Sequence, residues 1–279
     1  MATWFDEVWD QNVRFGLRVE AHLHSERSEF QQIDIFETAA FGRVLALDGV
    51  YQTTVGDEFH YHEMLVHPAL CTAPRIDNVL IIGGGDGGTA REVLRHPEVQ
   101  HVTLAELDVA VVDACKQHMG EMNVPWDDPR LTLACGDGVA FLRDAKAGAF
   151  DVILVDGPDP VGPAAGLFQS PFYEDCKRCL GDSGVLASQI EGPHLMAADF
   201  DRIVHTLRGV FTRADPYFGP VPTYVSGFWA YALCSERVDR RELFGSRVER
   251  IEANSRYWNR EIHAATFAMP NGIKRRLRR

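Results

Sequence analysis

The chain has 279 residues, 46% of them hydrophobic, which is enough to bury a substantial core. Its 28 basic and 40 acidic residues give a formal net charge of −12, which argues against nucleic acid as the main partner and favours cationic ligands. No apolar run approaches the roughly 20 residues of a membrane helix, and the N-terminal residues lack the pattern of a signal peptide. We therefore expect a cytoplasmic protein with no membrane partner.

The first part of the chain alternates apolar and polar residues as β-strands do. The pattern is strand-like from Leu17 to about Thr54, and residues 42–49 predict a strand followed by a turn. We expect residues 1–56 to form a small N-terminal domain of β-hairpins. A helix is predicted from about Asp57, and we expect it to end before the region between Pro68 and Pro74.

From Arg75 onward, predicted strands and helices alternate, which indicates a doubly wound parallel sheet. The strands are expected at residues 79–82, 102–106, 131–135 and 151–155, and the helices between them at 89–95, 109–119 and 139–143. Further strands are expected at residues 184–189, 210–214 and 228–235, with a helix near 198–207. Residues 57–279 are thus predicted to form a Rossmann-like α/β domain of the methyltransferase type.

The six cysteines are scattered through segments that have the composition of a core, so we expect reduced and buried thiols. Only Cys176 and Cys179 form a CxxC pattern. It falls in a predicted helix and no second CxxC is present, so helix packing explains it better than zinc or redox chemistry.

The most informative motif is the glycine-rich turn at residues 83–88, which follows the strand at 79–82. Glycine allows a positive φ and close backbone approach, and the next helix offers free N–H groups, so the turn suits a nucleotide-type ligand. Asp86 lies inside this turn. A carboxylate there repels a pyrophosphate or an amino-acid carboxylate but suits an ammonium or sulfonium group.

Acidic residues follow four successive predicted strands. In open α/β sheets, ligands bind outside the carboxyl ends of the strands. One such acid is readily explained as a helix cap, but five are better explained by a shared site: Asp86, Glu106, Asp137, Asp156 and Asp159.

Two of these acids have positions that suit an adenosine ligand. Glu106 lies 23 positions after Gly83, a spacing at which an acid commonly accepts the hydroxyls of a ribose. Asp137 is placed to accept from an adenine amine. The alternatives are a carboxylate at a helix start for Glu106 and a cap of the following helix for Asp137.

Asp156 and Asp159 lie in a loop rich in proline and glycine. An alkylamine is mostly protonated at neutral pH, so an enzyme that uses it as a nucleophile must remove a proton and anchor any second cationic end. Two acids in one loop can divide these tasks.

These residues resemble the spermidine synthase family of polyamine aminopropyltransferases over essentially the whole chain. The likeness rests on residues 46–54, 57–64, 83–88, 156–160, 222–224 and 256–259. It implies transfer of an aminopropyl group from decarboxylated S-adenosylmethionine to a diamine, usually putrescine, with release of methylthioadenosine. It implies no metal or redox cofactor.

By position, the resemblance implies that Asp86 holds the ammonium of the donor, Glu106 its ribose and Asp137 its adenine. The remaining residues expected around the donor and methylthioadenosine are Gln31, Gln52, His62, Gly138 and Pro163.

For the acceptor, the resemblance implies that Asp156 is the general base and Asp159 anchors the distal ammonium. Tyr61 and Tyr224 would orient the amine, Gln189 would help to hold it and Trp9 would wall its far end. Core packing remains the alternative for the three aromatic residues, and backbone hydrogen bonding for Gln52 and Gln189. His60 and His62 form an H-x-H pair without an evident third metal ligand.

The chain departs from the family pattern directly after Asp156. Family members often carry a small hydroxyl residue there, whereas this chain has Gly157 and Pro158. The spacing of the two acids is kept, while the backbone shape and one hydroxyl contact differ.

Four alternative functions can be compared with these residues. An ordinary S-adenosylmethionine methyltransferase usually has an acid before its glycines, where this chain has Ile82, and a nicotinamide dehydrogenase leaves four of the acids unexplained. A silent polyamine-binding protein would be favoured by loss of Asp156 or Tyr224, and both are present. An acceptor other than putrescine, such as agmatine, cadaverine or a triamine, stays open.

Two expectations concern assembly and motion. The resemblance suggests a homodimer or homotetramer with the N-terminal β-domain at the interface, where exposed hairpin edges favour burial. Residues 160–168 have the composition of a gate that closes over bound ligands.

Overall fold

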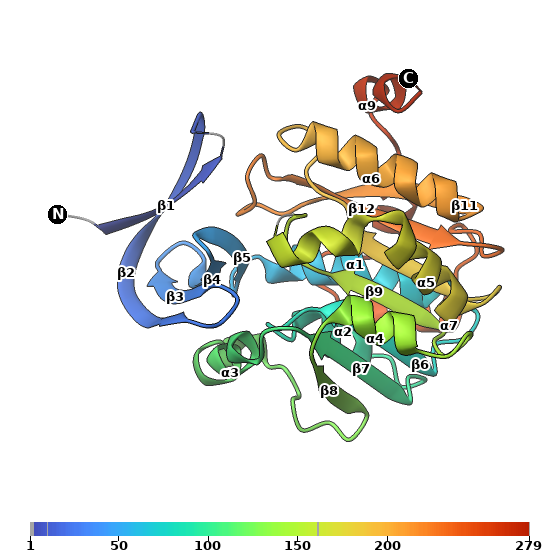
Figure 1. Cartoon of the computed structure of the whole chain (residues 1–279), viewed down its shortest axis with the longest axis horizontal. Coiled ribbons are helices and arrows are strands. Elements are labelled where there is room, and N and C mark those ends of the chain that lie inside the picture. Colours follow the sequence, from blue (N-terminus) through green and yellow to red (C-terminus); the bar gives the residue numbers. More distant parts are fainter. Residues whose placement is uncertain (1–2, 10, 161, 279) are drawn as a thin grey trace.

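The computed structural model describes residues 3–9, 11–160 and 162–278, and it contains two β-sheets (Figure 1). The first sheet has five antiparallel strands in the order of the chain: β1 (Thr3–Trp9), β2 (Val13–Arg27), β3 (Gln32–Thr38), β4 (Gly42–Leu47) and β5 (Val50–Thr54). Asp48 and Gly49 join β4 to β5, and both have a positive φ, as a two-residue hairpin of type I′ requires. The predicted strand and turn at residues 42–49 are confirmed.

The second sheet has seven strands in the order β11-β12-β10-β9-β6-β7-β8. The five strands from β10 to β8 are parallel, whereas β12 runs antiparallel to both β10 and β11. The strands are β6 (Asn78–Gly83), β7 (His101–Glu106), β8 (Leu131–Cys135), β9 (Val152–Asp156), β10 (Val185–Gln189), β11 (Arg213–Pro220) and β12 (Phe228–Ser235). The Rossmann-like fold is confirmed, with an antiparallel addition at one edge.

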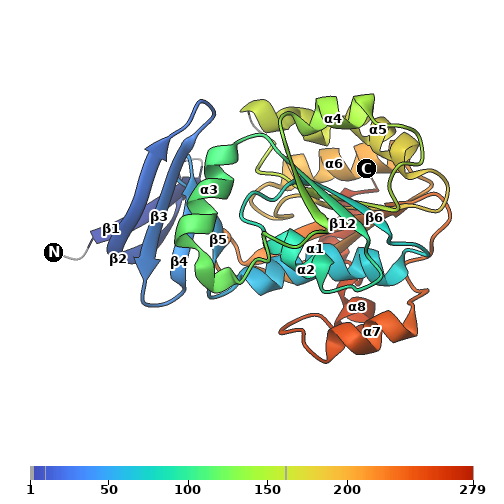
Figure 2. The ribbon, with the colours of Figure 1, turned by 90° about the horizontal axis from the view of Figure 1, so that it is seen from below.

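Helices cover both faces of this sheet (Figure 2). One face carries α4 (Gly138–Asp144), α5 (Ser170–Leu180) and α6 (Ala197–Val210), and the other carries α1 (Glu58–Thr72), α2 (Gly88–Leu94) and α7 (Gly245–Glu252). The remaining helical segments are α3 (Val109–His118), α8 (Arg260–Thr266), α9 (Asn271–Arg276) and the short 3₁₀ helices η1 (Gly120–Met122) and η2 (Gly162–Phe168). Among the described helices, none combines the length and apolar content that a bilayer crossing requires.

The predicted end of the first long helix before Pro68 is wrong, because α1 continues to Thr72. A proline inside a helix removes the N–H that would bond the carbonyl four residues earlier. Here that carbonyl belongs to Met64, and it accepts a hydrogen bond of 2.9 Å from the Tyr217 hydroxyl on β11 instead. A long-range partner therefore offsets the loss.

The strand predicted at residues 210–214 is also displaced. Helix α6 continues to Val210, and β11 begins at Arg213 and extends to Pro220. Pro216 and Pro220 are tolerated because β11 is an edge strand, where a missing N–H need not break the ladder.

All six cysteines are free, and five of them are buried as expected. Cys135 is the exception, since it lies exposed at the end of β8. The packing interpretation of the CxxC pattern agrees with the burial of Cys176 and Cys179 in α5.

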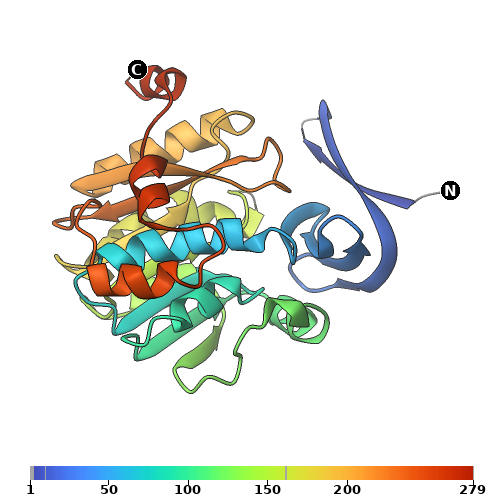
Figure 3. The same cartoon turned by 180° about the vertical axis from the view of Figure 1, so that it is seen from behind.

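The segment that precedes α8 is fixed to the back of α1. The buried Glu63 carboxylate accepts three backbone N–H bonds of 2.8 Å, from Arg256, Tyr257 and Trp258. At the other end of α1, Arg247 of α7 donates to the carbonyls of Leu70 and Ala73. Figure 3 shows α1 (cyan) beside these orange-red C-terminal helices. The family-like segment at residues 256–259 thus holds α1 in place.

We predict that Glu63→Gln destabilises the fold. An amide keeps one acceptor oxygen but turns a donor toward the remaining N–H groups, so at least one buried N–H loses its partner. Because hydrogen bonds to a buried charge are strong, we expect the free energy of unfolding to fall by about 2–4 kcal/mol. This loss should lower the urea midpoint. Glu249→Gln, at an exposed position of α7, is the matched control. Equal midpoints for both variants would contradict the bracing role of Glu63.

Candidate active site

A cavity of about 300 Å³ opens at the carboxyl ends of strands β6 to β9, between the two sheets. We call it the large cavity. Leu45, Leu47 and Val50 of the first sheet wall it on one side. All five acids predicted at successive strand ends line it: Asp86, Glu106, Asp137, Asp156 and Asp159. The structure therefore brings together the residues that the sequence pattern grouped.

The glycine turn forms the floor of this arrangement. Gly83 has a φ of 79°, and a Cβ there would overlap the carbonyl oxygen of Asp156. The N–H of Gly84 donates to that same oxygen at 2.9 Å. A Cβ at Gly88 would likewise overlap the His62 ring. The turn needs glycine because functional side chains and backbone pack directly against it.

Asp156 has a hydrogen-bond donor on each carboxylate oxygen. The Tyr61 hydroxyl donates to Oδ1 at 2.8 Å, and the Thr89 hydroxyl donates to Oδ2 at 2.7 Å. Burial, with the nearby charge of Asp86, raises the pKa of Asp156 above its ordinary value. This carboxylate is therefore held in place and is a better proton acceptor than an exposed aspartate.

His62 lies under the cavity between two carboxylates. Its Nδ1 is 2.6 Å from Glu58 Oε2, and its Nε2 is 3.4 Å from Asp86 Oδ2. Burial opposes charging of the ring, but Asp86 and Glu58 outweigh it and raise the pKa of His62 well above its usual range. The two acids thus favour the protonated ring, whose positive charge partly neutralises Asp86. Arg91 adds a second positive charge by donating to Glu58 at 2.7 Å.

Glu106 lies at the end of β7, beside a polar cluster. Burial raises the pKa of Glu106 to about 7. Its Oε1 accepts from the N–H of Asp108 at 2.9 Å, and Asp108 accepts in turn from Gln31 Nε2 at 2.9 Å. Gln31 also lines the large cavity.

Asp137 is both a cap and a lining residue. Its side chain accepts from the N–H of Val139 at the start of α4, at 2.8 Å. It also lines the large cavity, as does Gly138. The predicted helix cap and a place in the cavity are therefore compatible. The side chain of Pro163 lies outside the described part of the chain.

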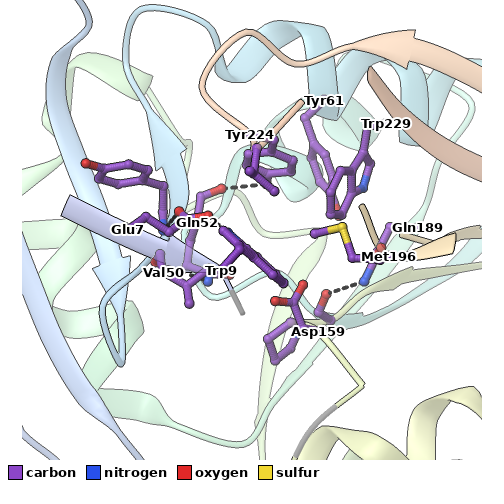
Figure 4. A pocket seen from close by; sticks show the side chains of 14 residues that line it. Glu7, Trp9, Val50, Gln52, Tyr61, Asp159, Gln189, Met196, Tyr224 and Trp229 are labelled. Atoms are coloured by element: carbon purple, nitrogen blue, oxygen red, sulfur yellow. Dashed lines mark hydrogen bonds between the residues drawn. The ribbon is translucent and has the colours of Figure 1, made fainter. Parts of the chain in front are cut away.

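A second cavity of about 30 Å³ adjoins the first and is shown in Figure 4. We call it the small cavity. Trp9 and Gln189 line the small cavity but not the large one, whereas Gln52, Tyr61, Asp159 and Tyr224 line both. The Tyr224 hydroxyl donates to the carbonyl of Gln52 at 2.6 Å, and Gln189 Nε2 donates to the carbonyl of Gly157 at 3.1 Å. Every described residue of the predicted acceptor set thus meets at this cavity or its edge.

Two buried acids near the small cavity were missed by the sequence interpretation. Glu7 of β1 lines it and accepts from the Trp9 indole and from the N–H of Tyr51. Glu191 is buried with a φ of 73°, and its carboxylate accepts from Gln189 Nε2 at 3.3 Å. Burial, with the charge of Glu7, raises the pKa of Asp159 to about 6. Neither acid belongs to a recognisable sequence motif, so only the three-dimensional arrangement reveals them.

Comparisons with known proteins agree with this geometry. A family model described as "Spermine/spermidine synthase domain" matches residues 58–242, and one described as "Spermidine synthase tetramerisation domain" matches residues 3–54. The polyamine aminopropyltransferase of Thermoanaerobacter sp. (strain X514) is 40% identical over 274 residues, 98% of each chain. That of Methanocaldococcus jannaschii is also 40% identical and covers 97% of this chain and 94% of its own.

Two crystal structures are similar over 99% of this chain and 94% of theirs, each with 36% sequence identity. A spermidine synthase in complex with the transition-state analogue AdoDATO superposes with a TM-score of 0.95. The spermidine synthase from Thermotoga maritima superposes with a TM-score of 0.92.

We predict that Glu106 makes the empty protein less stable as the pH rises. Its pKa is 4.5 in an unperturbed chain and about 7 in the fold, so between these values the folded state binds a proton that the unfolded state does not. Stability therefore falls as the pH rises through this window and levels off above it. The measurement is the thermal midpoint of the ligand-free wild type and of Glu106→Gln from pH 5 to pH 8. A difference between the two that does not change with pH would contradict the prediction.

Proposed function

The chain belongs to the spermidine synthase family of polyamine aminopropyltransferases, and on this premise we propose that it converts putrescine and decarboxylated S-adenosylmethionine into spermidine and methylthioadenosine. The observation that carries the proposal is the pair of adjoining cavities. Tyr61, Asp159 and Tyr224 line both, and Asp156 lies at the junction through its hydrogen bond from Tyr61.

The large cavity has the size and polarity for the donor. Asp86 accepts the aminopropyl ammonium, Glu106 the ribose hydroxyls and Asp137 the adenine amine in this proposal. His62 positions Asp86 through the contact between its Nε2 and Asp86 Oδ2. The other residues proposed to contact the donor or methylthioadenosine are Gln31, Gln52, Gly138 and Pro163.

The small cavity has the character of a site for a short diamine. Asp159 anchors the distal ammonium, Trp9 and Gln189 flank the chain, and Tyr61 with Tyr224 orients the attacking nitrogen. Its apolar wall of Trp9, Met196 and Trp229 supports a short diamine such as putrescine over a longer acceptor. Cadaverine, agmatine or a triamine would require these side chains to move further than putrescine would.

The proposed reaction needs little beyond alignment and removal of a proton. The amine nitrogen attacks the methylene carbon bonded to the sulfonium sulfur, and the carbon–sulfur bond breaks with its electron pair going to sulfur. The sulfonium is already an activated leaving group, so the protein chiefly aligns the three atoms and excludes water. Asp156 accepts the proton that the amine must lose. No step requires a metal or redox cofactor.

We also propose that the chain assembles as a homodimer or homotetramer through the sheet β1–β5, and that residues 1–56 and 57–279 are its two domains. The match of residues 3–54 to a tetramerisation domain supports the assembly. So do Trp4 and Val8 on the edge strand β1, which are 58% and 53% exposed. Helix η2 occupies most of the predicted gate at residues 160–168, and its gating role stays a prediction.

We predict that methylthioadenosine release from decarboxylated S-adenosylmethionine depends on putrescine. Putrescine, cadaverine, agmatine and spermidine are offered separately, and intact S-adenosylmethionine serves as the donor control. We expect putrescine to give the highest kcat/KM, because the apolar side chains of Trp9, Met196 and Trp229 border the small cavity. A higher value with another amine would overturn the acceptor, whereas no release with any amine would overturn the transferase activity.

The same assay tests the general base. Asp156→Asn should lower kcat by about 10²–10⁴-fold, the usual contribution of general base catalysis, while methylthioadenosine still binds. Asp144→Asn, an exposed acid at the end of α4, is the matched control. Near-wild-type turnover by Asp156→Asn would remove this residue from the base role.

We predict that the interface involves β1. Light scattering after size exclusion should give the mass of two or four chains for the wild type and a smaller mass for the double variant Trp4→Lys, Val8→Lys. Phe244→Lys, at another exposed apolar residue, should leave the mass unchanged. A wild type that elutes as a monomer would refute the assembly.

A further inference from the structure

Thr89 lies directly after the glycine turn, and the proposed reaction gives it no role. It occupies the first turn of α2 and is fully buried. It lines neither cavity. Its hydroxyl nevertheless donates to Asp156 Oδ2 at 2.7 Å. A group that touches the proposed base but no substrate acts through that base.

The two donors to Asp156 differ in what lies beyond them. Tyr61 on α1 lines both cavities, so an amine that enters the small cavity competes for or shares its contact with Oδ1. Thr89 is shielded from both cavities, so its contact with Oδ2 persists while the amine binds and reacts. One oxygen therefore stays fixed while the other is free to exchange partners.

The anchoring extends to the backbone of Asp156. Gly84 in the same turn donates its N–H to the Asp156 carbonyl at 2.9 Å. The glycine turn and the helix that follows it therefore hold both the main chain and the carboxylate of this one residue. Thr89 supplies the only side chain of that segment found in a hydrogen bond to Asp156 among the described residues.

We propose that Thr89 is a positioning residue, whose hydroxyl fixes the Asp156 carboxylate for proton transfer from the amine. The inference rests on the proposed role of Asp156 as the general base. A hydrogen bond to the ionised form favours that form, so Thr89 also lowers the proton affinity of the carboxylate. This opposes burial and the charge of Asp86, which raise it.

Other titratable groups near Asp156 also affect the pKa of its carboxylate. They come from the glycine turn, α1, β7 and the region around β12, and they are Asp86, His62, Tyr61, Glu106, Tyr224 and Tyr231. A substitution at Thr89 leaves all six unchanged, so a shift of the pH profile reports on the lost hydroxyl.

The test compares Thr89→Val, which is nearly isosteric but has no hydroxyl, with Thr89→Ser, which keeps it. We expect Thr89→Val to lower kcat about tenfold near neutral pH and to move the acid limb of the pH profile up by about one unit, because a bond to a charged group is lost. KM values should change less than threefold, since Thr89 touches neither cavity. Thr89→Ser should restore the profile.

Three outcomes would overturn the proposal: a wild-type pH profile for Thr89→Val, equal losses for valine and serine, or loss of methylthioadenosine binding with kcat. If the valine variant does not fold, Thr89→Ala removes the same hydroxyl and leaves a smaller side chain. The single variant Asp156→Asn, assayed beside Thr89→Val, separates this proposal from the one on which it rests. Asp156→Asn with wild-type activity refutes the base, whereas an inactive Asp156→Asn with an unaffected Thr89→Val refutes only the role of Thr89.

Discussion

The whole site depends on the close approach of the glycine turn to the end of β9. Strands β6 and β9 are parallel neighbours, with Gly83 opposite Asp156, and the turn after β6 continues this pairing through the bond from Gly84 N–H. Any side chain at Gly83 would overlap the Asp156 backbone. This single contact brings Asp86, Asp156 and Thr89 close together. It explains why the acid inside the turn after β6 and the acid at the end of β9, the neighbouring strand in the sheet, belong to one site.

The second constraint is an excess of negative charge in a buried space. No lysine or arginine is among the described residues that line either cavity, and the nearby His62 ring is already shared between Asp86 and Glu58. Burial, with neighbouring acids, raises the pKa of Asp156 and Asp159. A ligand with ammonium and sulfonium groups relieves this repulsion. The repulsion among the buried carboxylates therefore favours the binding of cationic ligands over neutral or anionic ones.

The sequence was sufficient where a local pattern has a local cause. The alternation of strands and helices predicted the parallel sheet. The position of Asp86 in the glycine turn and the spacing of Glu106 predicted that both acids lie at the cavity that they line. It was insufficient where a distant residue decides. The hydroxyl of Tyr217 that sustains α1 past Pro68 comes from β11, and the antiparallel direction of β12 follows from its connection rather than its composition. Glu7 lines the small cavity from β1, and Glu191 accepts a hydrogen bond from Gln189, which also lines it. Nothing in the local sequence marks either acid.

The departure from the family pattern after Asp156 also has a structural counterpart. A Cβ at Gly157 would lie 2.9 Å from Leu167 Cδ1, and Leu167 belongs to η2 and lines the large cavity. Glycine therefore leaves room for η2 to pack against the loop between the two acids. A side chain at this position would push the end of the Leu167 side chain aside. Pro158 then restricts the backbone between Asp156 and Asp159, so a stiff loop and the packing of η2 together limit how these two acids can move relative to each other.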